Sequence, residues 1–366
     1  MRRLTPLIAL LAFLWAAAPP SFAQPGHGPG GGPPLPLPPI TSAMTDAEIA
    51  TGLGAWLDDI ALRDGFSGVV LVAREGREVF SAAHGLANRD ARAAVTPATT
   101  FNFGSIGKAI THVAIMQLVE AGKLKLTDTV GQWLPDYPQP QTRSATIDQL
   151  LGHRGGVADF VGPAFMDMPK ASLTSNAVYF GLVASRPPVF APGEREQYCN
   201  GCYVVLGEII ARASGETYEQ YVGNNVFALA GMATASFTPP PAGAIPYGTP
   251  RPGSPLVDVS SWHGLAGNAS GGSHAAARDL LALDTALRDG RLAGAGSAAV
   301  LRADPAVADW PRSRIGFAGG APGVSALMSG GHGWTIIVLA NLEPPAAERI
   351  GRAIDTALLG PAKSRN

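Results

Sequence analysis

Charged residues are scarce in this sequence, and neither sign dominates. Only 15% of the 366 residues are Asp, Glu, Lys or Arg, with 27 basic against 28 acidic side chains. An average soluble domain carries roughly 25%. The formal net charge of −1 excludes a strongly basic nucleic-acid-binding protein and a chain with a polyanionic tail. We therefore expect no nucleic-acid partner.

Long apolar runs are also missing after the first residues. Residues 7–18 form an apolar run of signal-peptide length, and no later segment reaches the ~18 apolar residues that a spanning helix needs. Arg2 and Arg3 precede this run, and residues 21–23 (SFA) follow it as a small-x-small cleavage site. The pattern predicts a cleaved signal peptide over residues 1–23, and a bacterial protein exported to the periplasm or secreted, without an integral membrane span. An uncleaved N-terminal anchor is the alternative.

Residues 24–40 are dominated by Gly and Pro, which predicts a tether. Beyond the tether, strand patterns lie near both ends of the chain and helix patterns fill the middle. We expect strands near residues 67–73, 79–84, 323–328 and 334–341, and helices near 45–63, 105–120, 146–151, 203–213, 278–288 and 346–359. This order predicts one α/β (α+β) domain over 41–362, whose sheet part (about 41–104 and 300–362) carries an inserted, mostly helical part (about 105–299).

Ser105 and Lys108 form the sharpest local signal for chemistry. They stand three residues apart at the start of a predicted helix, which places both side chains on one face. A serine hydroxyl is a poor nucleophile until a base takes its proton, and a lysine can do so when burial disfavours its ammonium form. The alternative is a helix-capping serine beside an exposed lysine.

Tyr198 and Asn200 supply a second signal, just before the helix predicted at 203–213. Two residues apart on an extended stretch, they can point the same way. A phenol held near an ammonium has its anionic form stabilised and can relay a proton. The amide of Asn200 can orient the lysine or a substrate carbonyl. A core aromatic with a satisfied hydroxyl is the alternative for Tyr198.

These motifs together resemble the serine β-lactamase and penicillin-binding-protein superfamily, and most closely its class C-like, esterase-like branch. The likeness is carried by 66–73 (FSGVVLVA), 101–108 (FNFGSIGK), 122–128 (GKLKLTD), 150–156 (LLGHRGG), 190–193 (FAPG), 198–200 (YCN) and 206–208 (LGE). It implies a β-lactamase/transpeptidase-like fold, with an antiparallel sheet flanked by helices. It also implies that Ser105 is acylated, that Lys108 and Tyr198 share proton transfer, and that Asn200 is a substrate-binding residue beside them.

The third motif of that superfamily departs from its usual pattern. Residues 316–323 (GFAGGAPG) match the strand that edges the site, and Phe317 stands where the superfamily has Lys or His. A cation there helps to bind the carboxylate of β-lactams and peptides, which an apolar ring cannot do. The backbone role is less affected, because the resemblance places the motif's glycine at Gly319 and an oxyanion-binding N–H at Gly320, opposite the N–H of Ser105.

Other candidates are weaker. Cys199 and Cys202 are the only cysteines, and in an exported protein they predict either a disulfide beside the site or two buried thiols. No suitably spaced histidine pair predicts a metal site. His153 falls in the LLGH segment, where the role implied is to orient a loop. Phe103 replaces the first glycine of a Gly-x-Ser-x-Gly elbow, which disfavours an α/β-hydrolase.

The sequence therefore predicts an exported serine hydrolase that acts through an acyl-enzyme on a small ester or amide and needs no cofactor. Esterase-like activity on an uncharged substrate is favoured because of Phe317. The alternatives are a β-lactamase or D-amino-acid peptidase, a penicillin-binding-type sensor that does not turn over, and an interaction module. The sequence predicts no oligomeric state.

Overall fold

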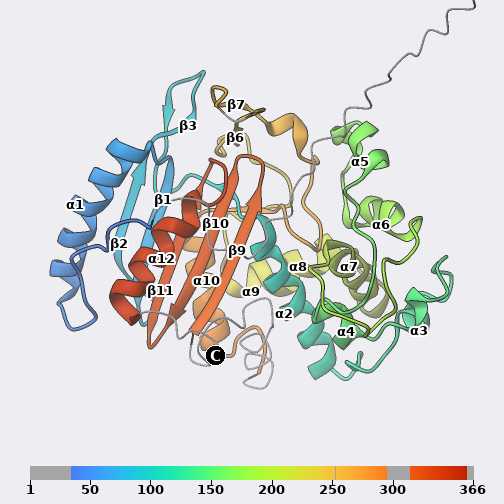
Figure 1. Ribbon diagram of the computed structural model, residues 1–366. Coiled ribbons are helices and arrows are strands. Elements are labelled where there is room, and N and C mark those ends of the chain that lie inside the picture. The colour runs from blue at the N-terminus through green and yellow to red at the C-terminus, as the bar shows by residue number, and fades with distance from the viewer. Residues whose placement is uncertain (1–33, 252, 295–313, 361–366) are drawn as a thin grey trace, which may run out of the picture.

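A five-stranded antiparallel sheet forms the centre of the sheet part. The computed structural model describes residues 34–251, 253–294 and 314–360, so the predicted signal peptide lies outside the described residues. The strand order is β2-β1-β11-β10-β9, which places the N-terminal strands beside the C-terminal ones (Figure 1). The strands are β1 Gly68–Arg74, β2 Arg77–His84, β9 Arg314–Ala321, β10 Val324–Gly331 and β11 Trp334–Ala340. This arrangement confirms the predicted fold class.

Strand β1 shows why the sheet has a core on both faces. Successive side chains of a strand point to opposite faces, and all residues from Gly68 to Ala73 are buried. Val69 and Leu71 join the larger apolar cluster, which continues into the helical part. Val70 and Val72 join a second cluster on the other face. A strand buried on both faces has a continuous apolar sequence, as this one does.

Helices cover both faces of the sheet. Helices α1 (Asp46–Asp64) and α12 (Ala346–Leu359) pack on the face that Val70 and Val72 line, and α10 (Ala277–Arg288) packs on the other. Thr45 begins α1 with a capping box, in which its hydroxyl and the Glu48 carboxylate satisfy each other's backbone N–H groups. Part of the segment predicted as a tether also packs here, because Ile40 is buried and the Trp56 indole donates to the Pro36 carbonyl at 2.9 Å.

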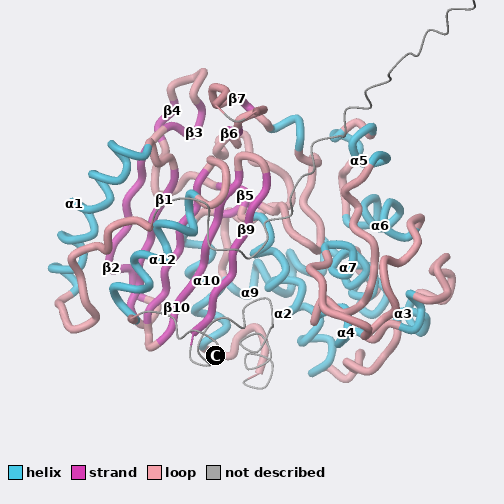
Figure 2. Tube along the Cα trace, in the orientation of Figure 1, coloured by secondary structure: helices cyan, strands magenta, loops and turns pink. Residues whose placement is uncertain are grey.

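The helical part is built around α2 (Gly107–Glu120), in which eleven of fourteen residues are buried. Helix α7 (Asn200–Ser214) packs against it. Figure 2 shows the helices of this part gathered beside the sheet. The remaining helices are α3 Val130–Trp133, α4 Ile147–Leu151, α5 Pro163–Asp167, α6 Asn176–Ala184, α8 Tyr218–Val222 and α9 Ala228–Ala230.

Short strand pairs fix the loops around the sheet. They are β3 Leu86–Asn88 with β4 Ala93–Ala94, β5 Phe101–Asn102 with β8 His274–Ala275, and β6 Tyr247–Gly248 with β7 Val257–Asp258. The β5–β8 pair brings the segment before Ser105 next to the segment after Ser270. Within the described ranges, every helix is too short or too polar to cross a membrane.

Candidate active site

Ser105 lies in a tight turn where the sheet part meets the helical part. Residues Gly104–Ile106 form a 3-10 turn that leads directly into α2. Gly104 has a φ of +52°, in the left-handed region that favours glycine, and its N–H donates to Asn102 Oδ1 at 2.8 Å. The turn therefore holds Ser105 at the N-terminal end of the buried helix α2.

The edge strand β9 comes directly against this turn. A Cβ atom on Gly319 would overlap the Phe103 carbonyl oxygen and lie 3.0 Å from the backbone nitrogen of Ser105. A Cβ atom on Gly104 would lie 2.9 Å from the backbone nitrogen of Gly320. Only glycine at these two positions permits such an approach of two backbones. The close packing of β9 on this turn consequently brings the backbone nitrogens of Ser105 and Gly320 near each other.

Lys108 is buried, with 7% of its surface exposed, and its ammonium group has three acceptors. Nζ donates to Asn200 Oδ1 at 2.7 Å, to the Ser270 carbonyl at 2.7 Å and to Ser105 Oγ at 3.3 Å. A lysine ammonium has three N–H groups, so these acceptors satisfy it completely. Lys108 is thus held on the same face as Ser105, as the three-residue spacing predicts.

Tyr198 approaches Ser105 from the helical part. Its hydroxyl donates to Ser105 Oγ at 2.7 Å, and its ring lies 4.7 Å from Lys108 Nζ. The imidazole of His153 stacks on this ring with a centroid distance of 5.0 Å. His153 Nδ1 accepts the N–H of Cys199 at 3.2 Å, which fixes the ring against the segment that carries Tyr198. His153 is therefore packed on the Tyr198 ring and hydrogen-bonded to the residue after it.

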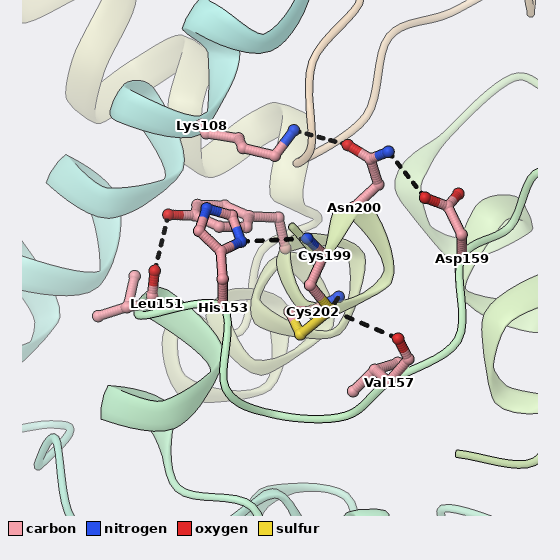
Figure 3. The surroundings of a disulfide bond; sticks show 9 residues. Lys108, Leu151, His153, Val157, Asp159, Cys199, Asn200 and Cys202 are labelled. Carbon is pink, nitrogen blue, oxygen red and sulfur yellow. Dashed lines mark hydrogen bonds between the residues drawn. A yellow bond between two sulfur atoms is a disulfide. The ribbon is translucent and has the colours of Figure 1, made fainter. Parts of the chain in front are cut away.

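A disulfide joins Cys199 to Cys202 at the start of α7 (Figure 3). Both residues are buried. The bond spans the first turn of the helix, and Tyr198 and Asn200 are the immediate neighbours of Cys199. The two polar residues predicted to act with Ser105 are therefore attached to a cross-linked turn.

Asn200 connects Lys108 to a carboxylate. Its Oδ1 accepts from Lys108, and its Nδ2 donates to Asp159 Oδ2 at 2.8 Å (Figure 3). Asp159 and the carbonyl of Ser270 are site groups that the sequence analysis missed. The only available signals are an acidic residue soon after residues 155–156 (GG) and the glycines that follow Ser270.

Phe317 lies on β9, but its ring does not line an open site. It is 9% exposed and belongs to the larger apolar cluster, with Met328 as its pair on β10. Position 317 therefore supplies apolar packing and no positive charge. Gly319 and Gly320 follow on the same strand, where the resemblance placed them.

Two histidines near the site are uncharged at neutral pH. Burial lowers the pKa of His112, one turn beyond Lys108, to about 4, and burial together with the neighbouring His263 lowers the pKa of His274 to about 4. Neither adds a positive charge beside Lys108. No group of three or more His, Cys, Asp or Glu side chains could hold a metal ion within the described parts of the chain.

Known proteins share this architecture. The beta-lactamase family model matches residues 57–360, which covers both parts of the domain. The putative penicillin-binding protein PbpX of Bacillus subtilis (strain 168) is 34% identical over 235 residues, which are 62% of this chain and 56% of that protein. Esterase EstB of Burkholderia gladioli is 31% identical over 239 residues, 59% of each chain. The chain thus spans less than two thirds of the length of these curated relatives.

A solved structure extends the likeness to nearly the whole domain. The crystal structure of a penicillin-binding protein from Bacillus halodurans has a TM-score of 0.72 and 28% identity, over 80% of this chain and 98% of that one. The match of the family model to most of the chain, together with the fold, settles the classification. The chain belongs to the beta-lactamase family, a family of serine hydrolases.

Proposed function

We propose that the protein is an exported serine hydrolase that forms an acyl-enzyme on Ser105 and favours small uncharged esters. The observation that carries this proposal is the contact of Ser105 Oγ with both the Tyr198 hydroxyl and Lys108 Nζ. A serine between two such groups has a partner for its proton and a nearby positive charge for the anion that forms. The similarity to esterase EstB supports the ester class.

Tyr198 is the direct proton acceptor in this proposal. Its oxygen is 2.7 Å from Ser105 Oγ, whereas Lys108 Nζ is 3.3 Å away and has an acceptor for each of its N–H groups. In the reactive form the Lys108–Tyr198 pair holds one proton fewer, with Tyr198 as phenolate and Lys108 as ammonium beside it. Ser105 Oγ attacks the carbonyl carbon while its proton passes to Tyr198.

The rest of the cycle uses the same groups. The N–H groups of Ser105 and Gly320 stabilise the oxyanion of the tetrahedral intermediate, whose collapse expels the alkoxide. Tyr198 returns the proton to this leaving group. A water molecule then attacks the acyl ester and gives its proton to Tyr198, and the proton goes back to Ser105 as the carboxylic acid leaves.

Phe317 supports an uncharged substrate. Its ring is buried, and the resemblance implies a cation for an anionic substrate at this position. A substrate carboxylate bound beside β9 would lose hydration without gaining a charged partner from position 317. A β-lactamase, a D-amino-acid peptidase or a penicillin-binding sensor is the second candidate, because two of the similar proteins are named penicillin-binding proteins.

Covalent labelling tests the nucleophile. We expect a fluorophosphonate probe to add one adduct to the intact mass of the protein and none to the Ser105→Ala variant. Ser270→Ala is the matched control, because its hydroxyl donates to Asn268 Oδ1 and its carbonyl, which Lys108 uses, remains. An adduct that persists in Ser105→Ala would contradict the assignment.

Two chromogenic substrates separate the candidate activities. Turnover of a p-nitrophenyl ester, without turnover of a cephalosporin, is expected for the esterase. A stable acyl adduct without turnover of either would indicate the sensor. Phe317→His should add little to ester hydrolysis, so a large gain would contradict the role given to Phe317.

Export is tested on the mature chain. We expect the full-length sequence, when expressed in a bacterium, to yield protein outside the cytoplasm. Its intact mass should be that of a chain that begins at Gln24. Arg2, Arg3 and the apolar residues 7–18 support this expectation. A recovered chain that keeps residues 1–23 would favour the uncleaved anchor.

A further inference from the structure

The amide of Asn200 has two different ends, and the site uses both. Its oxygen can only accept a hydrogen bond and its NH₂ group can only donate. The Lys108 ammonium has no lone pair, so only the oxygen end can face it. Asn200 Oδ1 does so at 2.7 Å, and Nδ2 faces Asp159 Oδ2 at 2.8 Å (Figure 3).

Asp159 is itself held firmly in place. Its Oδ1 accepts the N–H of Val161 at 3.0 Å, and its backbone carbonyl accepts from Arg186 Nη1. The preceding residue lies against the start of α7, because a Cβ atom on Gly201 would overlap the carbonyl of Ala158. The carboxylate therefore has a fixed position relative to Asn200.

We propose that Asp159 is a positioning residue for the reaction at Ser105, acting through Asn200. By accepting from Nδ2 it fixes which end of the amide faces Lys108. If the amide rotated by 180°, its NH₂ group would meet the ammonium and its oxygen would meet the carboxylate, so both contacts would become repulsive. This inference rests on the proposed function and extends it.

A purely local role for Asp159, as the acceptor of the turn to Val161, makes a different prediction. Asp159→Ser keeps a side-chain oxygen for that N–H but is too short to reach Asn200. Asp159→Asn keeps the shape and the turn acceptor but presents NH₂ to the NH₂ of Asn200. If the role is positioning, both variants should be phosphonylated by the fluorophosphonate about tenfold more slowly, or worse, with thermal stability near that of the wild type.

An exchanged pair provides the rescue. When Asp159→Asn is combined with Asn200→Asp, the new amide at position 159 accepts from Val161 through its oxygen and donates through its NH₂ to the new carboxylate at position 200. That carboxylate in turn accepts from Lys108. Asn200→Asp alone places two carboxylates together. We expect each single variant to be slow and the double variant to recover to within about tenfold of the wild type, a non-additive result that a local role does not give.

The outcomes separate the two claims. Asp148→Asn is the control, because this carboxylate pairs with Arg154 at the surface and its loss should leave the labelling rate unchanged. A wild type that labels at Ser105, with Asp159 variants that label equally fast or a double variant that shows the product of the single losses, contradicts the positioning role alone. A wild type that does not label at Ser105 contradicts the proposed function and the inference with it.

Discussion

The hydroxyl of Tyr198 lies 2.7 Å from Ser105 Oγ, although 93 positions separate the two residues in the sequence. Tyr198 is attached to the cross-linked start of α7, and Ser105 to the turn that begins α2. The packing of α7 against α2 therefore sets the distance over which the serine proton moves. The proposed reaction therefore depends on the contact between two helices that are far apart in the sequence.

Removing the tyrosine hydroxyl tests this distance. Tyr198→Phe should lower kcat/KM for a p-nitrophenyl ester by about 10²–10⁴-fold, the usual contribution of general acid–base catalysis. Tyr203→Phe is the matched control. Its ring also lies near Lys108 and contacts the His153 ring at a tilt, but its hydroxyl donates to the Leu151 carbonyl. That variant should lose about 1 kcal/mol of stability and keep its activity. Equal activity losses in the two variants would contradict the role of Tyr198.

Adding one methyl group at Gly319 tests the close approach of the two backbones. Gly319→Ala places a Cβ atom on the Phe103 carbonyl, so β9 or the turn at Ser105 must move. We expect a loss of about 1–3 kcal/mol of unfolding free energy and a severe loss of fluorophosphonate labelling. Ala318→Ser, on the exposed neighbouring position, should change neither quantity. Normal labelling in Gly319→Ala would mean that Gly320 and Ser105 need not be this close.

Reduction of the Cys199–Cys202 disulfide should destabilise the start of α7. The loop-closure entropy of so short a loop corresponds to about 2 kcal/mol, so a dithiol reductant should lower the Tm. Ester turnover should fall as well, because Tyr198 and Asn200 adjoin the bond. The Cys199→Ala/Cys202→Ala chain should not respond to the reductant. If the reductant does not lower the Tm of the wild type either, the disulfide does not stabilise the fold.

Buried His112 should make the stability depend on pH. Burial lowers its folded pKa from 6.5 to about 4, so between these values the unfolded chain binds more protons than the folded one. The stability that His112 contributes by staying neutral is thus fully present above pH 6.5, and this contribution falls by about 1 kcal/mol per pH unit as the pH drops toward 4. Denaturant titrations of His112→Phe should show a shallower slope. An unchanged slope in His112→Phe would contradict this prediction.

Local patterns allowed much of the fold to be predicted, and one strand shows where they do not suffice. Strands β1 and β11 are apolar runs, and α12 begins and ends where periodicity places it. Strand β9 contains three glycines and has no strand pattern, so only the family resemblance located it. Its strand conformation comes from pairing with β10. A pattern search within one short segment does not include such a contact between segments.

The candidate site divides in the same way. Ser105 and Lys108 share a helix face, so their spacing is informative on its own. Asp159 and Ser270 enter through long-range contacts, 41 residues from Asn200 and 162 from Lys108, and Ser270 contributes a backbone carbonyl that any residue type would supply. The burial of Phe317 was likewise not predicted, because it depends on which side of β9 faces the helical part.

The pairing of β1 with β11 constrains when the protein can become active. Gly68 of β1 pairs with Ala340 of β11. The β1–β2 hairpin therefore has no strand beside β1 until β11 has been made. The same late segment carries Gly320, one of the two N–H groups assigned to the oxyanion. A nascent chain therefore carries Ser105 long before β9 has been made, and the proposed reactive centre can assemble only after that strand has been synthesised. Such non-local closure also predicts slow folding relative to a helical protein of equal stability.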